Sequence, residues 1–319
     1  LISILKNELN ESLSNKIILE LKLTSLQESF SNIHFPKNHI KLIKARFRLK
    51  FEELFFIQLQ HLKKHSDNKT KIKGYEFLKV GEFFNTFYKN HLPFNLTNDQ
   101  KKVIKEIRKD LGTGSQMNRL LQGDVGSGKT IVALLSMLIA LDNKFQACFM
   151  APTEILAFQH HKNLKSILED MPIQVEILTG STKPSIRKNI HEKLSNGDIN
   201  IIVGTHSLIE DKVIFKNLGI VIIDEQHRFG VAQRAKLWYK NNFPPHVLVM
   251  TATPIPRTLA MSIYGDLDFS VIRELPPGRK QIKTFLMGEN NRLKLFKFLK
   301  EQIDLGKQIF IVYPLIEES

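Results

Sequence analysis

Apolar positions in residues 1–90 recur at spacings of three, four and seven, which is the pattern of amphipathic helices. The clearest example is "HIKLIKARFRLKFEELFFIQLQHLKKH" (39–65), whose apolar face consists of Ile43, Phe47, Phe51, Leu54, Phe55 and Leu62. The other face carries Lys41, Lys44, Arg46, Arg48 and Lys50. We interpret it as a solvated basic face, with contacts to nucleic-acid phosphates as the alternative. The polar stretch "KHSDNKTKIKG" (64–74) is predicted to be a loop between helices.

From about residue 91 the pattern changes to short β-branched runs that alternate with helical stretches. The candidate strands are "NRLLQ", "QACFMA", "QVEILT", "INIIVG", "GIVIID" and "HVLVMT". Several are continuously apolar, as expected of strands that helices cover on both faces. The alternation predicts an α/β domain built on a parallel sheet.

A Pro-Gly linker, "ELPPGRK" (274–280), precedes a helical stretch (289–304) and one more apparent buried strand, "QIFIVYP". We expect these to open a second α/β unit that the chain does not complete. The predicted organisation is a helical segment (1–90), a nucleotide-binding domain (91–273), and a linker with the start of a second domain (274–319). The chain begins at Leu1 and stops just after the last apparent strand, so we expect it to be a segment of a longer protein.

Charge and cysteine content narrow the class of protein. The net charge is +14 and the pI about 9.6, which favours a polyanionic partner over a solvated basic surface by a small margin. The single cysteine, Cys148, excludes an intramolecular disulfide and fits the reducing cytoplasm. The longest apolar run, "IVALLSMLIAL" (131–141), is too short to span a bilayer, so we predict no membrane association.

The segment "GDVGSGKT" (123–130) carries the strongest chemical motif. It matches G-x-x-x-x-G-K-[ST], with Gly123, Gly128, Lys129 and Thr130 at the fixed positions, and Asp124, Val125, Gly126 and Ser127 between them. Glycines let successive backbone N–H groups face phosphates, the lysine supplies a cation, and the threonine hydroxyl serves Mg²⁺. A chance glycine turn is disfavoured, because the motif follows a short apolar strand and precedes an apolar helix that would add its dipole.

A second segment, "GIVIIDEQH" (219–227), supplies the carboxylates that such a loop requires. A buried strand that ends in Asp224 places its carboxylate at the edge of the sheet, where it can hold Mg²⁺. Glu225 is then placed to orient and deprotonate the attacking water. The alternative is an ordinary charged turn. We predict no metal site at His160 and His161, which have no Cys or acid at ligand spacing.

Several short segments of the sequence resemble motifs of superfamily 2 helicases. They are "DEQH" (224–227), "PFNLTNDQ" (93–100), "APTEILAFQH" (151–160), "GTHSLI" (204–209) and "TATPIPRTLA" (251–260). The extended forms, with "VYPLIEES" (312–319), resemble the RecG family of bacterial ATP-dependent DNA helicases over almost the whole chain. The resemblance implies an α/β fold: a RecA-like P-loop NTPase domain with a parallel sheet, preceded by a helical segment that follows a missing wedge domain, and followed by an incomplete second RecA-like domain.

The resemblance also assigns roles at matching positions. It implies ATP and Mg²⁺ as cofactors, with Lys129, Asp224, Glu225 and His227 as catalytic residues. Gln100 would read adenine with Phe94 stacked nearby. The residues that couple nucleotide to DNA would be Thr153, Thr205, His206, Arg228, Gln233, Arg234, Thr251 and Thr253. For any single threonine the alternative is a helix N-cap, and for each histidine it is a structural role. Arg257 is either a relay or a helix-start residue.

The implied function is ATP-driven translocation on double-stranded DNA by a monomeric motor that remodels forks and Holliday junctions in recombination and repair. Motors of this type take an arginine finger from the second domain, so we expect the chain alone to bind ATP·Mg²⁺ weakly and hydrolyse it slowly or not at all.

Three alternatives remain. A transcription-repair coupling translocase shares "TATPIPRTL" and "HRFGV", but usually has Glu where this chain has Gln226 and Phe where it has Ser127. A P-loop nucleotide switch would need no motif that couples hydrolysis to a track. A remnant that only binds nucleic acid is disfavoured by the intact Lys129, Thr130 and carboxylates.

Overall fold

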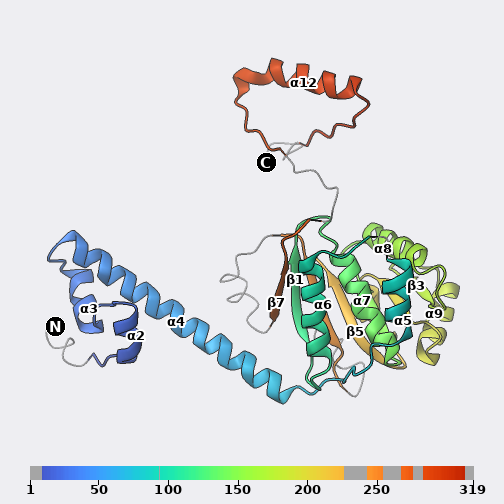
Figure 1. Cartoon of the computed structure of the whole chain (residues 1–319), viewed down its shortest axis with the longest axis horizontal. Coiled ribbons are helices and arrows are strands. Elements are labelled where there is room, and N and C mark those ends of the chain that lie inside the picture. Colours follow the sequence, from blue (N-terminus) through green and yellow to red (C-terminus); the bar gives the residue numbers. More distant parts are fainter. Residues whose placement is uncertain (1–8, 93, 226–242, 254–266, 276–282, 313–319) are drawn as a thin grey trace. The chain divides into compact units, whose positions relative to one another are not determined.

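The computed structural model describes residues 9–92, 94–225, 243–253, 267–275 and 283–312. By its internal contacts the chain divides into two units, Leu1–Pro276 and Pro277–Ser319. The first contains a group of N-terminal helices and an α/β domain (Figure 1). None of the helices in these described ranges is both long enough and apolar enough to cross a membrane.

The N-terminal helices are α2 (Asn15–Glu20), α3 (Leu26–His34) and α4 (His39–Lys71), and α3 packs along the beginning of α4 (Figure 1). Helix α3 begins at Ser25, whose side chain accepts a hydrogen bond from the backbone N–H of Glu28. The helical prediction for this region is confirmed. The predicted loop at 64–74 is wrong, because α4 continues to Lys71. Neither glycine nor proline occurs between His65 and Lys73, so no residue there breaks the helix.

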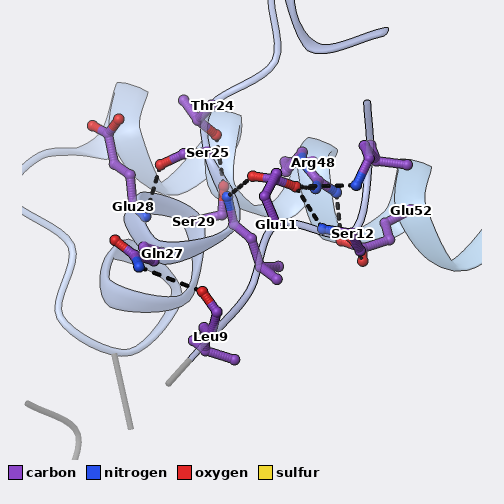
Figure 2. A network of polar contacts seen from close by, with 12 residues as sticks. Leu9, Glu11, Ser12, Thr24, Ser25, Gln27, Glu28, Ser29, Arg48 and Glu52 are labelled. Carbon is purple, nitrogen blue, oxygen red and sulfur yellow. Dashed lines mark hydrogen bonds and ion pairs between the residues drawn. The ribbon is translucent and has the colours of Figure 1, made fainter. Parts of the chain in front are cut away.

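Arg48 is the centre of a polar network that holds these helices together (Figure 2). Its side chain is fully buried, with Nη2 2.5 Å from Glu11 and Nη1 bonded to Glu52. Glu11 also accepts the backbone N–H groups of Leu13 and Leu26. Burial raises the pKa of Glu11, but these hydrogen bonds and the Arg48 charge outweigh it and lower the pKa. The prediction of a solvated Arg48 is therefore wrong, because its side chain is buried and paired with the carboxylates of Glu11 and Glu52.

The apolar face predicted for α4 is open to solvent in the structure. Ile43, Phe47, Leu54 and Leu62 are each at least half exposed, whereas Ala45, on the side that faces α3, is buried. Phe51 and Phe55 stack on each other along the helix, with ring centroids 5.8 Å apart. In this region of α4 the buried side is therefore the one that carries Ala45 and Arg48, and the predicted apolar face is not the one that packs inward.

The α/β domain is built on a seven-stranded sheet with the order β3-β4-β2-β5-β6-β1-β7, in which every pairing is parallel. The strands are β1 (Asn118–Gly123), β2 (Gln146–Met150), β3 (Val175–Leu178), β4 (Ile201–Gly204), β5 (Leu218–Asp224), β6 (His246–Thr251) and β7 (Asp268–Ile272). The first six confirm the predicted strands and the α/β class. The edge strand β7 was not predicted, because its short sequence "DFSVI" includes the polar Asp268 and Ser270.

Helices cover both faces of this sheet, as the continuous apolar strands require. Alternate strand residues face opposite sides: Phe149 lies in one apolar cluster, while its neighbours Cys148 and Met150 lie in the other. The first cluster is covered by α6 (Asn98–Leu111), α7 (Lys129–Asp142) and α8 (Glu154–Ile167), and the second by α9 (Pro184–Asn196) and the turn η2 (His206–Ile209).

The segment that leads into the α/β domain joins its core. Phe77 and Phe87 are buried in the first apolar cluster, and α5 (Glu82–Thr86) packs beside α7. Asp142, at the end of α7, accepts the backbone N–H groups of Gly81 and Phe83 at 2.8 and 2.9 Å. A π-helical turn, η1 (Phe87–His91), follows α5. This segment therefore packs on the same face of the sheet as the phosphate-loop helix.

The second unit contains one long helix in its described part. The turn η4 (Glu289–Asn291) and helix α12 (Arg292–Asp304) confirm the helix predicted over 289–304. The buried strand predicted at "QIFIVYP" is wrong as far as Val312: residues 308–312 form no strand, and Phe310 and Val312 are exposed. A strand requires a paired neighbour, and the described residues of this unit provide none.

Candidate nucleotide-binding site

The registers of three strands bring the predicted phosphate loop and carboxylates to one edge of the sheet. Strand β6 lies between β1 and β5, with Gln122 opposite Thr251 and Asp224 opposite Met250. The end of β5 and the beginning of the loop after β1 are therefore level with each other. They are two strand spacings apart, roughly 10 Å. This edge holds the carboxyl ends of parallel strands, where α/β sheets bind ligands.

The loop between β1 and α7 has the backbone of a phosphate cradle. Gly126 and Gly128 have φ values of 74° and 85°, in the left-handed region that favours glycine. Gly128 is the N-cap of α7, and a Cβ atom there would also clash with the side-chain amide of Gln100. The loop thus feeds directly into the N-terminus of a helix buried from Ile131 to Leu141, which favours an anion at this position.

The side chains of the loop fit a magnesium-bound triphosphate. The ammonium of Lys129 curls over the loop and donates to the carbonyl oxygens of Gly123 and Asp124 at 2.7 and 3.0 Å. Thr130 is the next residue of α7 and is half-buried. The hydroxyl of Ser127 is buried, and no partner for it is found within the described residues. A cation, hydroxyls and glycine backbone at a helix N-terminus are the groups that hold phosphate and Mg²⁺.

The side chain of Gln100 holds the backbone of the phosphate loop through a hydrogen bond to Ser127. Gln100 is fully buried; its side chain accepts from the backbone of Thr97 in a capping box and donates to the carbonyl oxygen of Ser127 at 2.8 Å. Phe94 lies before α6 and is about one-third exposed. The amide of Gln100 thus fixes the phosphate loop, and its recognition of adenine stays a prediction.

The carboxylate of Glu225 is held by the end of β6. Glu225 has φ of +51°, a strained conformation for a residue with a side chain. Its Oε1 accepts the backbone N–H of Ala252 at 3.0 Å, and its Oε2 lies 3.5 Å from the hydroxyl of Thr251. That hydroxyl in turn accepts the N–H of Thr253 at 3.1 Å. The predicted water-activating acid therefore contacts Thr251, one of the residues predicted to couple it to DNA, and reaches Thr253 through the Thr251 hydroxyl.

His160 is a site residue that the sequence did not reveal. Its Nε2 lies 3.0 Å from Oδ2 of Asp224, although the two residues are 64 positions apart. The prediction that His160 has no nearby acid holds along the sequence but not in space. The sequence held no signal for this contact, because it depends on the strand order, in which β2, the strand before α8, lies beside β5. No group of three or more His, Cys, Asp and Glu side chains in the described ranges could hold a metal; Mg²⁺ held by one carboxylate and phosphates requires none.

The residues predicted to lie on the nucleic-acid path follow neighbouring strands of the same sheet. Thr153 is the N-cap of α8 and accepts from Leu156 N at 3.3 Å. Thr205 is buried, with its hydroxyl 3.4 Å from that of Ser207, and His206 is exposed. Their contacts with DNA stay predictions. The remaining predicted positions lie outside the described residues and also stay predictions: Gln226, His227, Arg228, Gln233, Arg234 and Arg257.

Comparison with known proteins identifies the family. The profile of the DEAD/DEAH box helicases matches residues 97–262. "ATP-dependent DNA helicase RecG" of Synechocystis sp. is 47% identical over 312 residues, and that of Thermotoga maritima is 47% identical over 317. Each alignment covers 98% of this chain, but only 37% and 40% of the relative.

A solved structure of RecG bound to a three-way DNA junction superposes with a TM-score of 0.80 at 43% identity. The match covers 97% of this chain and 41% of that one. The resemblance to RecG helicases predicted from the motifs is thus confirmed, over about two-fifths of the relatives' length. The chain belongs to the DEAD/DEAH box helicase family.

Proposed function

We propose that this chain is the ATP-binding half of a helicase that translocates on double-stranded DNA and remodels branched DNA, including forks and Holliday junctions, in recombination and repair. The observation that carries the proposal is the shared sheet edge of the phosphate loop, Asp224 and Glu225. The sequence identity with RecG helicases, one of them solved on a three-way DNA junction, supports DNA as the substrate. The net charge of +14 suits a phosphate-rich partner.

The residues of the site support a division of labour. Lys129 and the backbone of the glycine loop bind the β- and γ-phosphates, while Thr130 and Asp224 are the residues that would hold Mg²⁺. Bound there, the metal would neutralise charge that develops on the phosphates. Glu225 orients the attacking water and accepts its proton. Because Glu225 also accepts the N–H of Ala252, its position is linked to the segment that carries Thr251 and Thr253, which would pass the nucleotide state to the DNA side.

The proposal extends to the organisation of the protein. Residues 1–90 form the helical linker segment after a wedge domain, residues 91–273 the first RecA-like domain, and residues 274–319 the linker and the start of a second. The motor acts as a monomer in the cytoplasm. A second RecA-like domain supplies the arginine finger, which is worth about 10³–10⁵ in rate. The chain by itself then binds ATP·Mg²⁺ weakly and turns it over slowly or not at all.

The test is DNA-stimulated ATP hydrolysis and junction remodelling by the full-length protein with single substitutions. Lys129→Ala is expected to abolish both activities, because the phosphates lose their cation. Glu225→Gln is expected to retain ATP binding and block turnover. Lys188→Ala, which removes an exposed lysine from α9, is the control and should leave both activities unchanged.

Three outcomes would contradict the proposal. Near-normal hydrolysis by Lys129→Ala would remove the phosphate loop from the mechanism. Lost ATP binding in Glu225→Gln would make that residue structural. Hydrolysis that DNA does not stimulate would favour a nucleotide switch over a translocase.

A further inference from the structure

We propose that His160 is the positioning residue for the magnesium carboxylate: by holding one oxygen of Asp224, it fixes the orientation in which the other oxygen meets the metal. The inference rests on the proposed ATPase site and adds a residue to it. His160 lies in the second turn of α8, and its imidazole contacts Asp224 at 3.0 Å.

The direction of this hydrogen bond follows from the chemistry of the two groups. A carboxylate oxygen can only accept, so Nε2 of His160 carries the hydrogen. On the other side of the ring, Nδ1 is buried and has no hydrogen-bond partner within the described residues. The polar contact that orients the imidazole in this part of the structure is thus the one to Asp224.

Packing holds the imidazole in place. Its ring lies against Phe149, with ring centroids 4.5 Å apart and an interplanar angle of 43°. Phe149 is fully buried in β2, the strand directly beside β5. The imidazole therefore rests on a rigid part of the core, and its side chain is only 13% exposed. Because packing on Phe149 restricts the His160 ring, the ring can restrict the orientation of the Asp224 carboxylate to which it hydrogen-bonds.

This arrangement has a consequence for metal binding. The side chain of Asp224 is 15% exposed and extends from the last residue of β5. Without a partner, its carboxylate would rotate about χ2, which is a broad torsion. A donor on Oδ2 restricts that rotation and leaves Oδ1 for the magnesium ion or its water. Loss of such an outer partner typically weakens metal binding about 10–100-fold.

The test measures how much Mg²⁺ the full-length protein requires to bind a fluorescent, non-hydrolysable β,γ-imido analogue of ATP. His160→Phe keeps an aromatic ring on Phe149 but removes the donor, and His160→Gln keeps a donor of similar reach. His161→Ala is the matched control, because that neighbouring imidazole contacts the carbonyl oxygen of Val175 instead. Asp224→Asn reports on the proposed metal ligand itself.

His160→Phe is expected to raise the Mg²⁺ concentration at half-saturation by about tenfold, and to leave binding in EDTA unchanged. His160→Gln and His161→Ala are expected to stay within about twofold of the original protein, and excess Mg²⁺ should restore the kcat of His160→Phe. If His160→Phe does not fold, as judged by its thermal melt, His160→Asn replaces it, because its shorter amide does not reach Asp224.

An unchanged Mg²⁺ requirement in the folded variant without the donor would overturn the inference, and so would a loss of binding in EDTA as well. Failure of His160→Gln to retain the original requirement would also overturn it. If Asp224→Asn itself leaves the Mg²⁺ requirement unchanged, the proposed metal ligand is wrong. That result is distinguishable from a failure at His160 alone.

Discussion

At the scale of single residues, the candidate site combines side chains that are neighbours in a motif with side chains that meet only in the folded chain. The sequence predicts Lys129, Thr130, Asp224 and Glu225 because each belongs to a short motif whose residue types suit phosphate, Mg²⁺ or water. The contact between His160 and Asp224 joins helix α8 to the end of β5, and no spacing along the chain encodes it. The strained φ of Glu225 is likewise a property of the folded turn.

His246 illustrates a second residue whose role only the fold reveals. It is fully buried at the start of β6, where Nδ1 accepts the N–H of Met117 at 2.9 Å and Nε2 donates to the carbonyl oxygen of Tyr75 at 2.8 Å. Burial lowers the pKa of His246 from 6.5 to about 4. The imidazole is therefore neutral in the folded protein, and it ties the segment before α5 to strands β1 and β6.

This lowered pKa predicts a loss of stability in acid. The unfolded state binds a proton at His246 more readily than the folded state does. The contribution of neutral His246 to the free energy of unfolding is therefore fully present above about pH 6.5 and is lost as the pH falls to about 4. At about 1.4 kcal/mol per pKa unit, the loss reaches about 3 kcal/mol. His246→Asn keeps an acceptor for Met117 but does not titrate, so urea unfolding should show a lower stability at pH 7.5 and a flatter decline to pH 4.5.

The control is His206→Asn, which removes an exposed histidine and should keep the original pH dependence. Equal slopes of stability against pH for the original protein and His246→Asn would show that His246 is not responsible for the acid sensitivity.

At the scale of elements, continuous apolar runs and glycine turns were enough to predict six of the strands and the helix after the phosphate loop. The wrong or missing predictions concern elements whose structure depends on strand pairing or on a partner far away in the sequence. The edge strand β7 is too short and polar to stand out, and the run at 308–312 has no strand beside it in the described part of its unit. In α4, helical periodicity defined two faces but could not show which one packs inward.

Arg48 provides an element-scale prediction. Arg48→Met would leave Glu11 and Glu52 facing each other without their shared cation, and both are only partly exposed. Breaking a buried ion pair costs about 3–5 kcal/mol; with this partial exposure we expect about 2 kcal/mol. Hydrogen exchange should therefore accelerate in α3 and the first half of α4. Lys44→Met, which removes the same charge from an exposed position of α4, should not accelerate it. Equal protection in the two variants would mean that the Arg48 network does not stabilise these helices.

At the scale of the whole molecule, the family could be predicted because five separate sequence motifs resemble the same group of helicases. RecG helicases that are 47% identical in alignments covering 98% of the chain confirm the resemblance. The chain nevertheless spans only about two-fifths of those relatives. Activity on DNA is therefore a proposal about the full-length protein, while the geometry of the candidate nucleotide-binding site belongs to this chain and can be tested in it.

The most direct test of that geometry replaces Mg²⁺ by Fe²⁺ in the presence of ATP. Radicals generated at the bound iron by ascorbate and peroxide cut the backbone close to the metal, and mass spectrometry locates the cuts. If Lys129, Asp224 and Glu225 serve one nucleotide, two groups of cuts will appear, around residues 129–130 and around 224–225. Both should require ATP, disappear with excess Mg²⁺ and weaken in Asp224→Asn. Cuts confined to one of the two segments would contradict a shared site.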